Sequence, residues 1–163
     1  MLKRFCWALA CSAAIVVPDQ ITKAVVRDHF ARWETVEVIP GFFNLTHVLN
    51  RGSAFGFLNR ADIDWQTGFL ISVNLLAMGF IAWLVATAPR RSGLLVAGLG
   101  LIWGGAMGNL IDRVSHGVVT DFLDFYLGQW HWPAFNVADM GISVGAGLAL
   151  LYYLLHRHAS DSL

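Results

Sequence analysis

Four long apolar runs constrain this chain more than any other feature of its sequence. They lie at about residues 5–26, 69–88, 93–111 and 137–155. Because an α-helix rises about 1.5 Å per residue, about 20 apolar residues cross the ~30 Å hydrocarbon core of a bilayer. The sequence therefore predicts a membrane-embedded all-α bundle of four transmembrane helices, in a single domain that covers residues 1–163.

The overall composition is typical of a membrane protein and argues against nucleic-acid binding. Hydrophobic residues make up 56% of the chain and charged residues 13%, whereas about a quarter of a typical soluble domain is charged. The 11 basic and 11 acidic residues balance, so the chain lacks the basic excess that nucleic acid attracts. Membrane lipids are therefore expected partners, and nucleic acid is not. Cys6 and Cys11 lie in the first run without a metal ligand at suitable spacing, and we interpret them as packing residues.

The first apolar run carries a pair of opposite charges near its end. Its basic start and residues 10–12 resemble a secretory signal with a cleavage site, but the run stays apolar through Val17, which favours a retained helix. Asp19 and Lys23 are four residues apart, so they face the same side of a helix and can pair. The pair has two open interpretations: a structural link between helix and loop, or part of a functional site.

Residues 28–64 have the composition of a small extramembrane β platform. Alternating segments at 35–39 and 43–48 predict short strands, with Pro40-Gly41 as the turn between them. The glycine-rich loop at 50–56 is expected to present polar groups to a substrate backbone, and its closure over a bound peptide is a hypothesis. The apolar residues of the platform leave two possibilities open: it lies on the bilayer surface, or it packs on its own helices.

The basic residues that flank the helices predict the orientation of the bundle. Cytoplasmic flanks of membrane proteins carry an excess of lysine and arginine. With four helices, one side of the membrane receives Lys3, Arg4, Arg90, Arg91 and Arg157. We therefore expect both termini in the cytoplasm, and the platform at the opposite, outer interface.

Two aspartates at that outer interface are the leading candidates for chemistry. A carboxylate near hydrocarbon costs on the order of 2.5–3.5 kcal/mol unless it is paired or faces water, so Asp121 and Asp139 are functional candidates. Two carboxyl groups a few Å apart share a proton, because like charges at that distance repel strongly. One can then take a proton from water while the other donates a proton to a carbonyl oxygen. This arrangement predicts direct hydrolysis of a peptide bond by water.

Other catalytic chemistries lack their motifs in this sequence. The chain contains no Gly-x-Ser-x-Gly segment, no His-Glu-x-x-His segment and no cysteine beyond the first run. His47, His116 and His131 could reach the outer side, but isolated interfacial histidines are usually structural or solvated. We therefore expect neither a metal nor an organic cofactor.

Five motifs, in order along the chain, resemble those of the bacterial lipoprotein signal peptidases, the signal peptidase II family. They are Asp19-Gln20-Ile21-Thr22-Lys23, Asn50-Arg51-Gly52-Ser53-Ala54-Phe55, Asn109-Leu110-Ile111-Asp112-Arg113, Val119-Thr120-Asp121-Phe122 and Phe135-Asn136-Val137-Ala138-Asp139. The resemblance extends over nearly the whole chain. It implies an aspartic endopeptidase of the bacterial inner membrane, with its site at the periplasmic interface. Its implied substrates are prolipoproteins, cut just before their diacylglyceryl-modified cysteine.

The resemblance also implies roles for particular residues. Asp121 and Asp139 correspond to the family's catalytic aspartates, whereas Asp124, although close in sequence, does not. Asp112 is expected to orient Arg113. The residues expected to bind substrate or support the site are Asn50, Arg51, Gly52, Asn109, Asp112, Arg113, Asn136, Asp19 and Lys23.

One position departs from the family pattern. Thr120 precedes Asp121, where the family commonly has valine. Threonine is similar in size and also β-branched, so we expect the aspartate to keep its position. The added hydroxyl offers one further hydrogen bond.

A small transporter or proton-conducting protein is the alternative interpretation, because charged residues in membranes also mark ion paths. The second, third and fourth runs carry few polar residues before their outer ends: Asn74, Ser72 and Ser143. A conducting path needs polar groups along its depth, so this pattern disfavours transport. A noncatalytic scaffold would not need two aspartates at matching interfacial positions.

Overall fold

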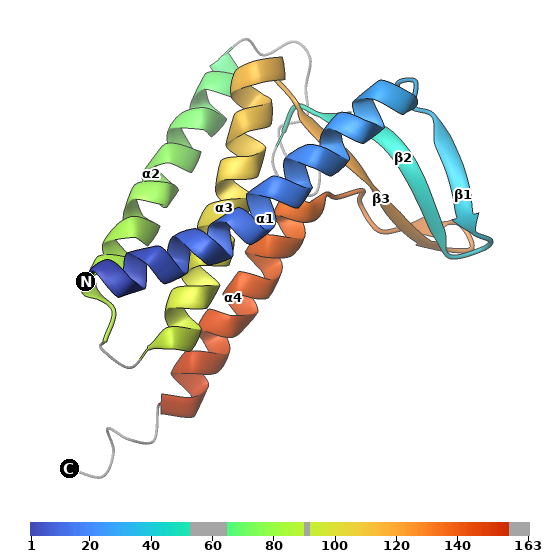
Figure 1. Cartoon of the computed structure of the whole chain (residues 1–163). Helices are drawn as coiled ribbons and strands as arrows, with labels where there is room; N and C mark the ends of the chain where they lie inside the picture. The colour runs from blue at the N-terminus through green and yellow to red at the C-terminus, as the bar shows by residue number, and fades with distance from the viewer. Residues whose placement is uncertain (53–64, 90–91, 157–163) are drawn as a thin grey trace.

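The computed structural model describes residues 1–52, 65–89 and 92–156. Its elements, in chain order, are α1 (Leu2–His29), β1 (Thr35–Ile39), β2 (Phe43–Asn50), α2 (Trp65–Thr87), α3 (Gly93–His116), β3 (Val119–Leu127), β4 (Trp130–His131) and α4 (Val137–His156). All four helices are long and apolar enough to cross a membrane by length and composition. The predicted bundle of four membrane-spanning helices with a small sheet is therefore confirmed, and Figure 1 shows the sheet at one end of the bundle.

Helix α3 lies at the centre of the bundle. In its most apolar stretch, 61% of the residues are buried, against 17–22% in the other three helices. The outward faces of α1, α2 and α4 carry large exposed apolar side chains, among them Leu9, Leu76 and Leu150. Exposed leucines are unfavourable in water and ordinary in lipid, so the exposure pattern agrees with a bundle surrounded by hydrocarbon.

Glycines let α1 and α4 approach the central helix closely. A Cβ atom at Gly104 would lie 2.7 Å from the backbone oxygen of Ser12 in α1. A Cβ atom at Gly105 would overlap the backbone oxygen of Ala138 in α4 and lie 2.7 Å from a side-chain carbon of Ile142. The small residues of the third apolar run therefore provide the close helix packing that association in lipid relies on.

The Gly105→Ala variant is expected to be clearly less stable than the native chain. A methyl group at this position forces α4 away from α3, and overpacking of this kind typically costs about 1–3 kcal/mol. Gly147→Ala in α4 is the matched control, because a Cβ atom there meets none of the described residues within 4 Å. Thermal unfolding midpoints in one detergent should fall for Gly105→Ala alone. Equal midpoints for the two variants would contradict this view of the helix contact.

The sheet is antiparallel with strand order β1-β2-β3-β4. The strands predicted at 35–39 and 43–48 are confirmed as β1 and β2. A further strand, which the sequence analysis does not predict, follows the third helix, because Val119–Leu127 forms β3 and pairs with β2. The first four residues of β3 are all buried, so the strand lacks the alternation of apolar and polar residues that betrays a half-exposed strand.

The turn between α3 and β3 depends on a glycine. Gly117 follows the last residue of α3 with φ of 72°, in the left-handed region, and its N–H donates to the carbonyl of Arg113. Glycine adopts this conformation without steric cost, which makes it a common residue at helix ends. The turn directs the chain from the end of α3 into the sheet.

Some sequence-based expectations concern residues outside the described ranges. Most of the predicted glycine-rich loop at 50–56, and with it the closure hypothesis, falls within 53–64. Arg90, Arg91 and Arg157, which contribute to the predicted orientation, are also outside the described residues.

Candidate active site

The two predicted catalytic aspartates come from different elements at the sheet end of the bundle. Asp121 lies on β3 and Asp139 lies in the first turn of α4. Asn136, just before α4, accepts a hydrogen bond from the N–H of Asp139 at 3.0 Å, and the Asp139 carboxylate accepts one from the N–H of Asn136 at 3.2 Å. This reciprocal pair is a capping box, which begins the helix and holds the Asp139 side chain in place.

Two asparagine side chains join the two carboxylates. The Nδ2 atom of Asn136 donates to Oδ1 of Asp121 at 2.7 Å and to Oδ1 of Asn109 at 3.2 Å. In turn, Nδ2 of Asn109 donates to Oδ1 of Asp139 at 2.9 Å. On the other side of Asp121, Nδ2 of Asn50 donates to Oδ2 at 3.0 Å. The structure therefore brings these five predicted residues into one hydrogen-bonded group.

The position of Asp121 disfavours its charged form. Its side chain is buried, with 3% of the residue exposed. This burial, together with the nearby charge of Asp139, raises the pKa of Asp121 to about 7, although hydrogen bonds from Asn50 and Asn136 act in the opposite direction. Near neutral pH the pair can therefore hold one proton between two carboxyl groups, as acid–base hydrolysis requires.

The raised pKa of Asp121 predicts a pH-dependent difference between the native chain and Asp121→Asn. In the unfolded chain an aspartate has a pKa near 3.9, so between about pH 4 and pH 7 only the native state holds the proton. Stability contributed by this group is then fully present below pH 4 and is lost as the pH rises through 7. The Asn variant lacks this loss. Its unfolding midpoint should therefore rise relative to that of the native chain from pH 5 to pH 7.

The quantity to follow is how the difference between the two unfolding midpoints changes with pH. The asparagine also alters hydrogen bonds, but that effect is the same at every pH. Unfolding in one detergent at pH 5, 6, 7 and 8 gives the required series. A difference that stays constant from pH 5 to pH 7 would contradict the raised pKa.

A buried lysine supports the site from α1. Lys23 is fully buried, and its Nζ atom lies 2.9 Å from Oδ2 of Asp19 and 3.4 Å from Oδ2 of Asp112. It also donates to Oδ1 of Asn109 at 2.9 Å. The predicted pairing of Asp19 with Lys23 is confirmed. Since a charge buried without partners is costly, the lysine and two carboxylates hold one another, and the lysine orients Asn109 toward Asp139.

Asp19 ties this network to the start of α4. Its Oδ1 atom accepts a hydrogen bond from the N–H of Ala138 at 2.8 Å. Ala138 immediately precedes Asp139, so the first helix helps to position the turn that carries the second candidate aspartate. Of the two interpretations of the Asp19–Lys23 pair, the contacts favour one in which it belongs to the site.

The contacts of Asp112 differ from the prediction that it orients Arg113. Its carboxylate accepts hydrogen bonds from the N–H of Thr120 at 2.9 Å and from Nη1 of Arg27 at 3.1 Å. Arg113 instead donates to the carbonyl of Gly52 at 2.8 Å. The reason is geometric, because adjacent residues on a helix do not face each other. Asp112 therefore holds the start of β3.

Arg27 was missed by the sequence analysis. Its Nη1 atom donates to the hydroxyl of Thr120 at 3.3 Å, which is the additional hydrogen bond expected of that threonine. Its spacing in the sequence could have identified it, because Arg27 follows Lys23 by four residues, just as Lys23 follows Asp19. Three residues at this spacing lie on one helix face.

The predicted loop residues Asn50, Arg51 and Gly52 lie at the edge of the carboxylate group. The N–H of Gly52 donates to Oδ1 of Asn50 at 2.9 Å, and the carbonyl of Arg51 accepts from Nε2 of Gln66 at 2.7 Å. Gln66 is almost fully buried and was also missed. These contacts tie the segment that follows β2 to the first turn of α2.

Asp124 has other partners. It accepts hydrogen bonds from Nδ2 of Asn44 at 2.9 Å and from Nδ1 of His131 at 2.9 Å. These contacts engage it within the sheet and give it no bond to Asp121 or Asp139 in the part of the chain that the structure describes. It therefore serves as a matched control for substitutions of the candidate pair.

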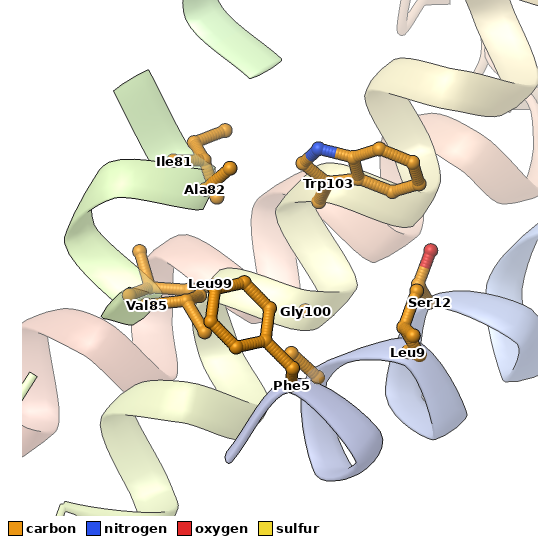
Figure 2. Close-up of a pocket in the computed structure, with 10 residues that line it drawn as sticks. Phe5, Leu9, Ser12, Ile81, Ala82, Val85, Leu99, Gly100 and Trp103 are labelled. Carbon is orange, nitrogen blue, oxygen red and sulfur yellow. The ribbon is translucent and has the colours of Figure 1, made fainter. Parts of the chain in front are cut away.

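A separate apolar cleft lies between α1, α2 and α3, within the bundle. Figure 2 shows side chains from these three helices around it, among them Phe5, Ile81 and Trp103. Its volume is about 120 Å³, and Ser12 is the one described lining residue with a hydroxyl group. Because the described lining holds no ionisable group, this cleft offers no acid–base chemistry.

Comparisons with known proteins agree on one family. A family model described as signal peptidase (SPase) II matches residues 11–155. The lipoprotein signal peptidase of Maridesulfovibrio salexigens is 53% identical over 135 residues, covering 83% of this chain and 86% of that protein. The lipoprotein signal peptidase of Nitratidesulfovibrio vulgaris is 48% identical over 143 residues, covering 88% of this chain and 86% of that protein.

Solved structures show the same architecture. One, described as a bacterial membrane enzyme determined by the in meso method at 2.3 Å resolution, has a TM-score of 0.83 and 26% identity, covering 96% of this chain and 91% of that chain. A second with the same description, at 1.9 Å resolution, has a TM-score of 0.79 and 27% identity, covering 90% of this chain and 92% of that chain.

Proposed function

The chain belongs to the signal peptidase II family, and from this membership we propose that Asp121 and Asp139 catalyse the removal of signal peptides from prolipoproteins. It is a bacterial membrane protein and a protease, so the transporter alternative is set aside. The observation that carries the residue assignment is the pairing of the buried Asp121 carboxyl group with the half-buried Asp139 carboxyl group through Asn109 and Asn136.

The proposed reaction is a direct attack of water on the peptide carbonyl carbon. Asp139, as the carboxylate, takes a proton from the water while Asp121, which holds the shared proton, donates it to the carbonyl oxygen. The resulting tetrahedral intermediate breaks its C–N bond as Asp139 gives the proton it took from water to the departing amine nitrogen and Asp121 takes a proton back from a hydroxyl of the intermediate. The two carboxyl groups titrate as a unit. The roles of base for Asp139 and acid for Asp121 therefore describe the pair before the first proton transfer.

The surrounding polar groups fit a role in holding an extended peptide. The Arg113 guanidinium donates to the Gly52 carbonyl. Asn50 donates to Asp121 and accepts a hydrogen bond from the N–H of Gly52. A lipid-anchored cysteine would keep the scissile bond at the depth where α3 ends and α4 begins. Such confinement replaces part of the entropic barrier by prior binding, up to roughly 7–11 kcal/mol in favourable intramolecular reactions.

The orientation is part of the same proposal. The basic residues at the start of α1, Lys3 and Arg4, favour the cytoplasmic side for that end. The sheet lies at the other end of the bundle (Figure 1), and its strand β3 carries Asp121, whereas Asp139 lies in the first turn of α4. We therefore assign the active site to the periplasmic interface of the inner membrane and both termini to the cytoplasm.

Cleavage by the purified full-length chain tests the proposal. A prolipoprotein that carries the diacylglyceryl group should be cut immediately before the modified cysteine, which sequencing of the product's N-terminus or mass spectrometry can establish. The same substrate without the lipid group is the control and should be cut much more slowly. Equal cleavage of both would contradict a site that depends on the lipid anchor.

A further inference from the structure

A polar cavity, separate from the apolar cleft described above, lies beside β3, the strand that carries Asp121. Its volume is about 370 Å³, and its lining consists of Arg27, Phe30, Arg32, His47, Leu49, His116, Val118 and Thr120. Thr120 and Leu49 are partners in the register between β3 and β2. Because successive side chains of a strand point to opposite faces, this cavity lies on the opposite face of β3 from Asp121. It is therefore separate from the candidate active site.

The lining of this cavity is basic. Among the residues that the structure describes, it contains two arginines and two histidines and no aspartate or glutamate. Arg27 is paired with Asp112, whereas exposed Arg32 has no ion pair within the described ranges. His116 is exposed at the last residue of α3. The lining itself is therefore basic, and the nearest carboxylates stand outside it: Asp112 on Arg27, and Glu34, whose Oε2 atom accepts from the N–H of Ala31 at 2.6 Å.

One histidine in the wall has an unused hydrogen-bonding atom. His47 is 5% exposed, and its Nδ1 atom lies 2.9 Å from the carbonyl oxygen of Phe30. A carbonyl can only accept, so Nδ1 carries the proton. The Nε2 atom is buried and has no partner among the described residues. Because a buried polar atom without a partner is unfavourable, a donor group that reaches Nε2 from the cavity, whose wall His47 forms in part, would be stabilised there.

We propose that this cavity binds the phosphate headgroup of an anionic phospholipid. Arginine side chains bind phosphate oxygens through two parallel N–H groups, and the lining residues Arg27 and Arg32 can supply such groups. In its neutral form His47 accepts a hydrogen bond at Nε2, so a headgroup that also carries a hydroxyl, as phosphatidylglycerol does, satisfies all three residues.

The place of the cavity in the fold favours a lipid over a free anion. It lies at the ends of α1 and α3, where both apolar helices finish, and Phe30, Leu49 and Val118 add apolar surface to its wall. Headgroups lie at this depth, and basic pockets between transmembrane helices bind anionic headgroups. Arg27 also bonds Asp112, which holds the start of β3, so the bound headgroup is linked to that strand through Arg27.

Lipid-dependent unfolding of the purified full-length chain tests this proposal. In a neutral detergent, added phosphatidylglycerol should raise the unfolding midpoint progressively, as a ligand of the native state does, and phosphatidylcholine should not. The double variant Arg32→Gln/His116→Gln should require about tenfold more phosphatidylglycerol for each hydrogen bond to the headgroup that it removes. Both substituted residues are exposed and lie outside the proposed catalytic group, so prolipoprotein cleavage reports that the variant has folded.

The matched control is Lys3→Gln/His156→Gln, which removes one basic residue and one histidine at the opposite end of the bundle. It should respond to phosphatidylglycerol as the native chain does. An equal response of the two double variants would overturn the proposed site, and an equal effect of phosphatidylcholine would overturn the anionic headgroup. If glycerol phosphate alone gave the full shift, the assignment to a lipid would be overturned.

Discussion

Replacing Asp139 by asparagine is expected to abolish prolipoprotein cleavage, with a loss of at least about 10³-fold, because positioned acid–base groups each contribute about 10²–10⁴-fold. Asparagine has nearly the same shape and can still accept one hydrogen bond, from Asn109 or from the N–H of Asn136. It cannot take a proton from water. The variant should therefore fold and bind the lipidated substrate without cutting it. Asp121→Asn should behave in the same way.

The measurement is a cleavage rate with saturating lipidated substrate, together with a binding assay on the same preparations. Asp124→Asn is the control, because it removes a carboxylate from the same strand that bonds Asn44 and His131 instead of the candidate pair. It should keep activity within a few-fold of the native chain. If Asp139→Asn cut at the native rate, or if only Asp124→Asn failed, the assignment of the pair would be wrong.

Replacing Lys23 by methionine is expected to destabilise the chain by about 3–5 kcal/mol, because it leaves buried charges without their partner. Asp19 would lose its ion pair, and Asp112 would keep Arg27 and the N–H of Thr120 as its partners among the described residues. Asn109 would lose the donor that orients its Oδ1 atom. Methionine fills a similar volume, so the loss reports charge more than packing. Cleavage should fall as well, since Asn109 bonds Asp139.

The matched control is Lys3→Met, which removes an exposed lysine from the same helix. Unfolding midpoints in one detergent should fall strongly for Lys23→Met and change little for Lys3→Met. Cleavage measured well below the lower midpoint then separates lost activity from lost fold. A small stability change for Lys23→Met would mean that water or a rearranged side chain compensates the carboxylates.

Much of the helical framework was predictable, since each span is a local property of its own residues. The apolar runs predicted at 5–26, 69–88, 93–111 and 137–155 became α1, α2, α3 and α4, each of which is longer than its predicted run. The added residues are mostly polar or aromatic, such as Trp65 at the start of α2 and His116 at the end of α3. Helices continue past the hydrocarbon until a turn residue stops them, and hydropathy does not report that point.

The candidate site was predictable in its residue types and only partly in its contacts. Asp121 and Asp139 were recognisable because charges beside long apolar runs are costly and therefore conspicuous. Their catalytic role stays a prediction until the variants are measured. The strand that carries Asp121 escaped notice, because burial on both faces removes the alternation that marks a strand.

By itself, the sequence determined that the chain has four helices able to span a membrane and that its first two strands follow the first of these helices, and it predicts that aspartates gather near one interface. These are consequences of hydropathy, periodicity and short-range spacing, which act within about 20 residues of chain. Only the tertiary structure decided that Asp112 bonds Arg27 and Thr120, and that Asn109 and Asn136 join the two carboxylates. The reason is physical: a buried polar side chain bonds whichever group the packed helices and strands bring within about 3 Å, and sequence distance does not limit that choice.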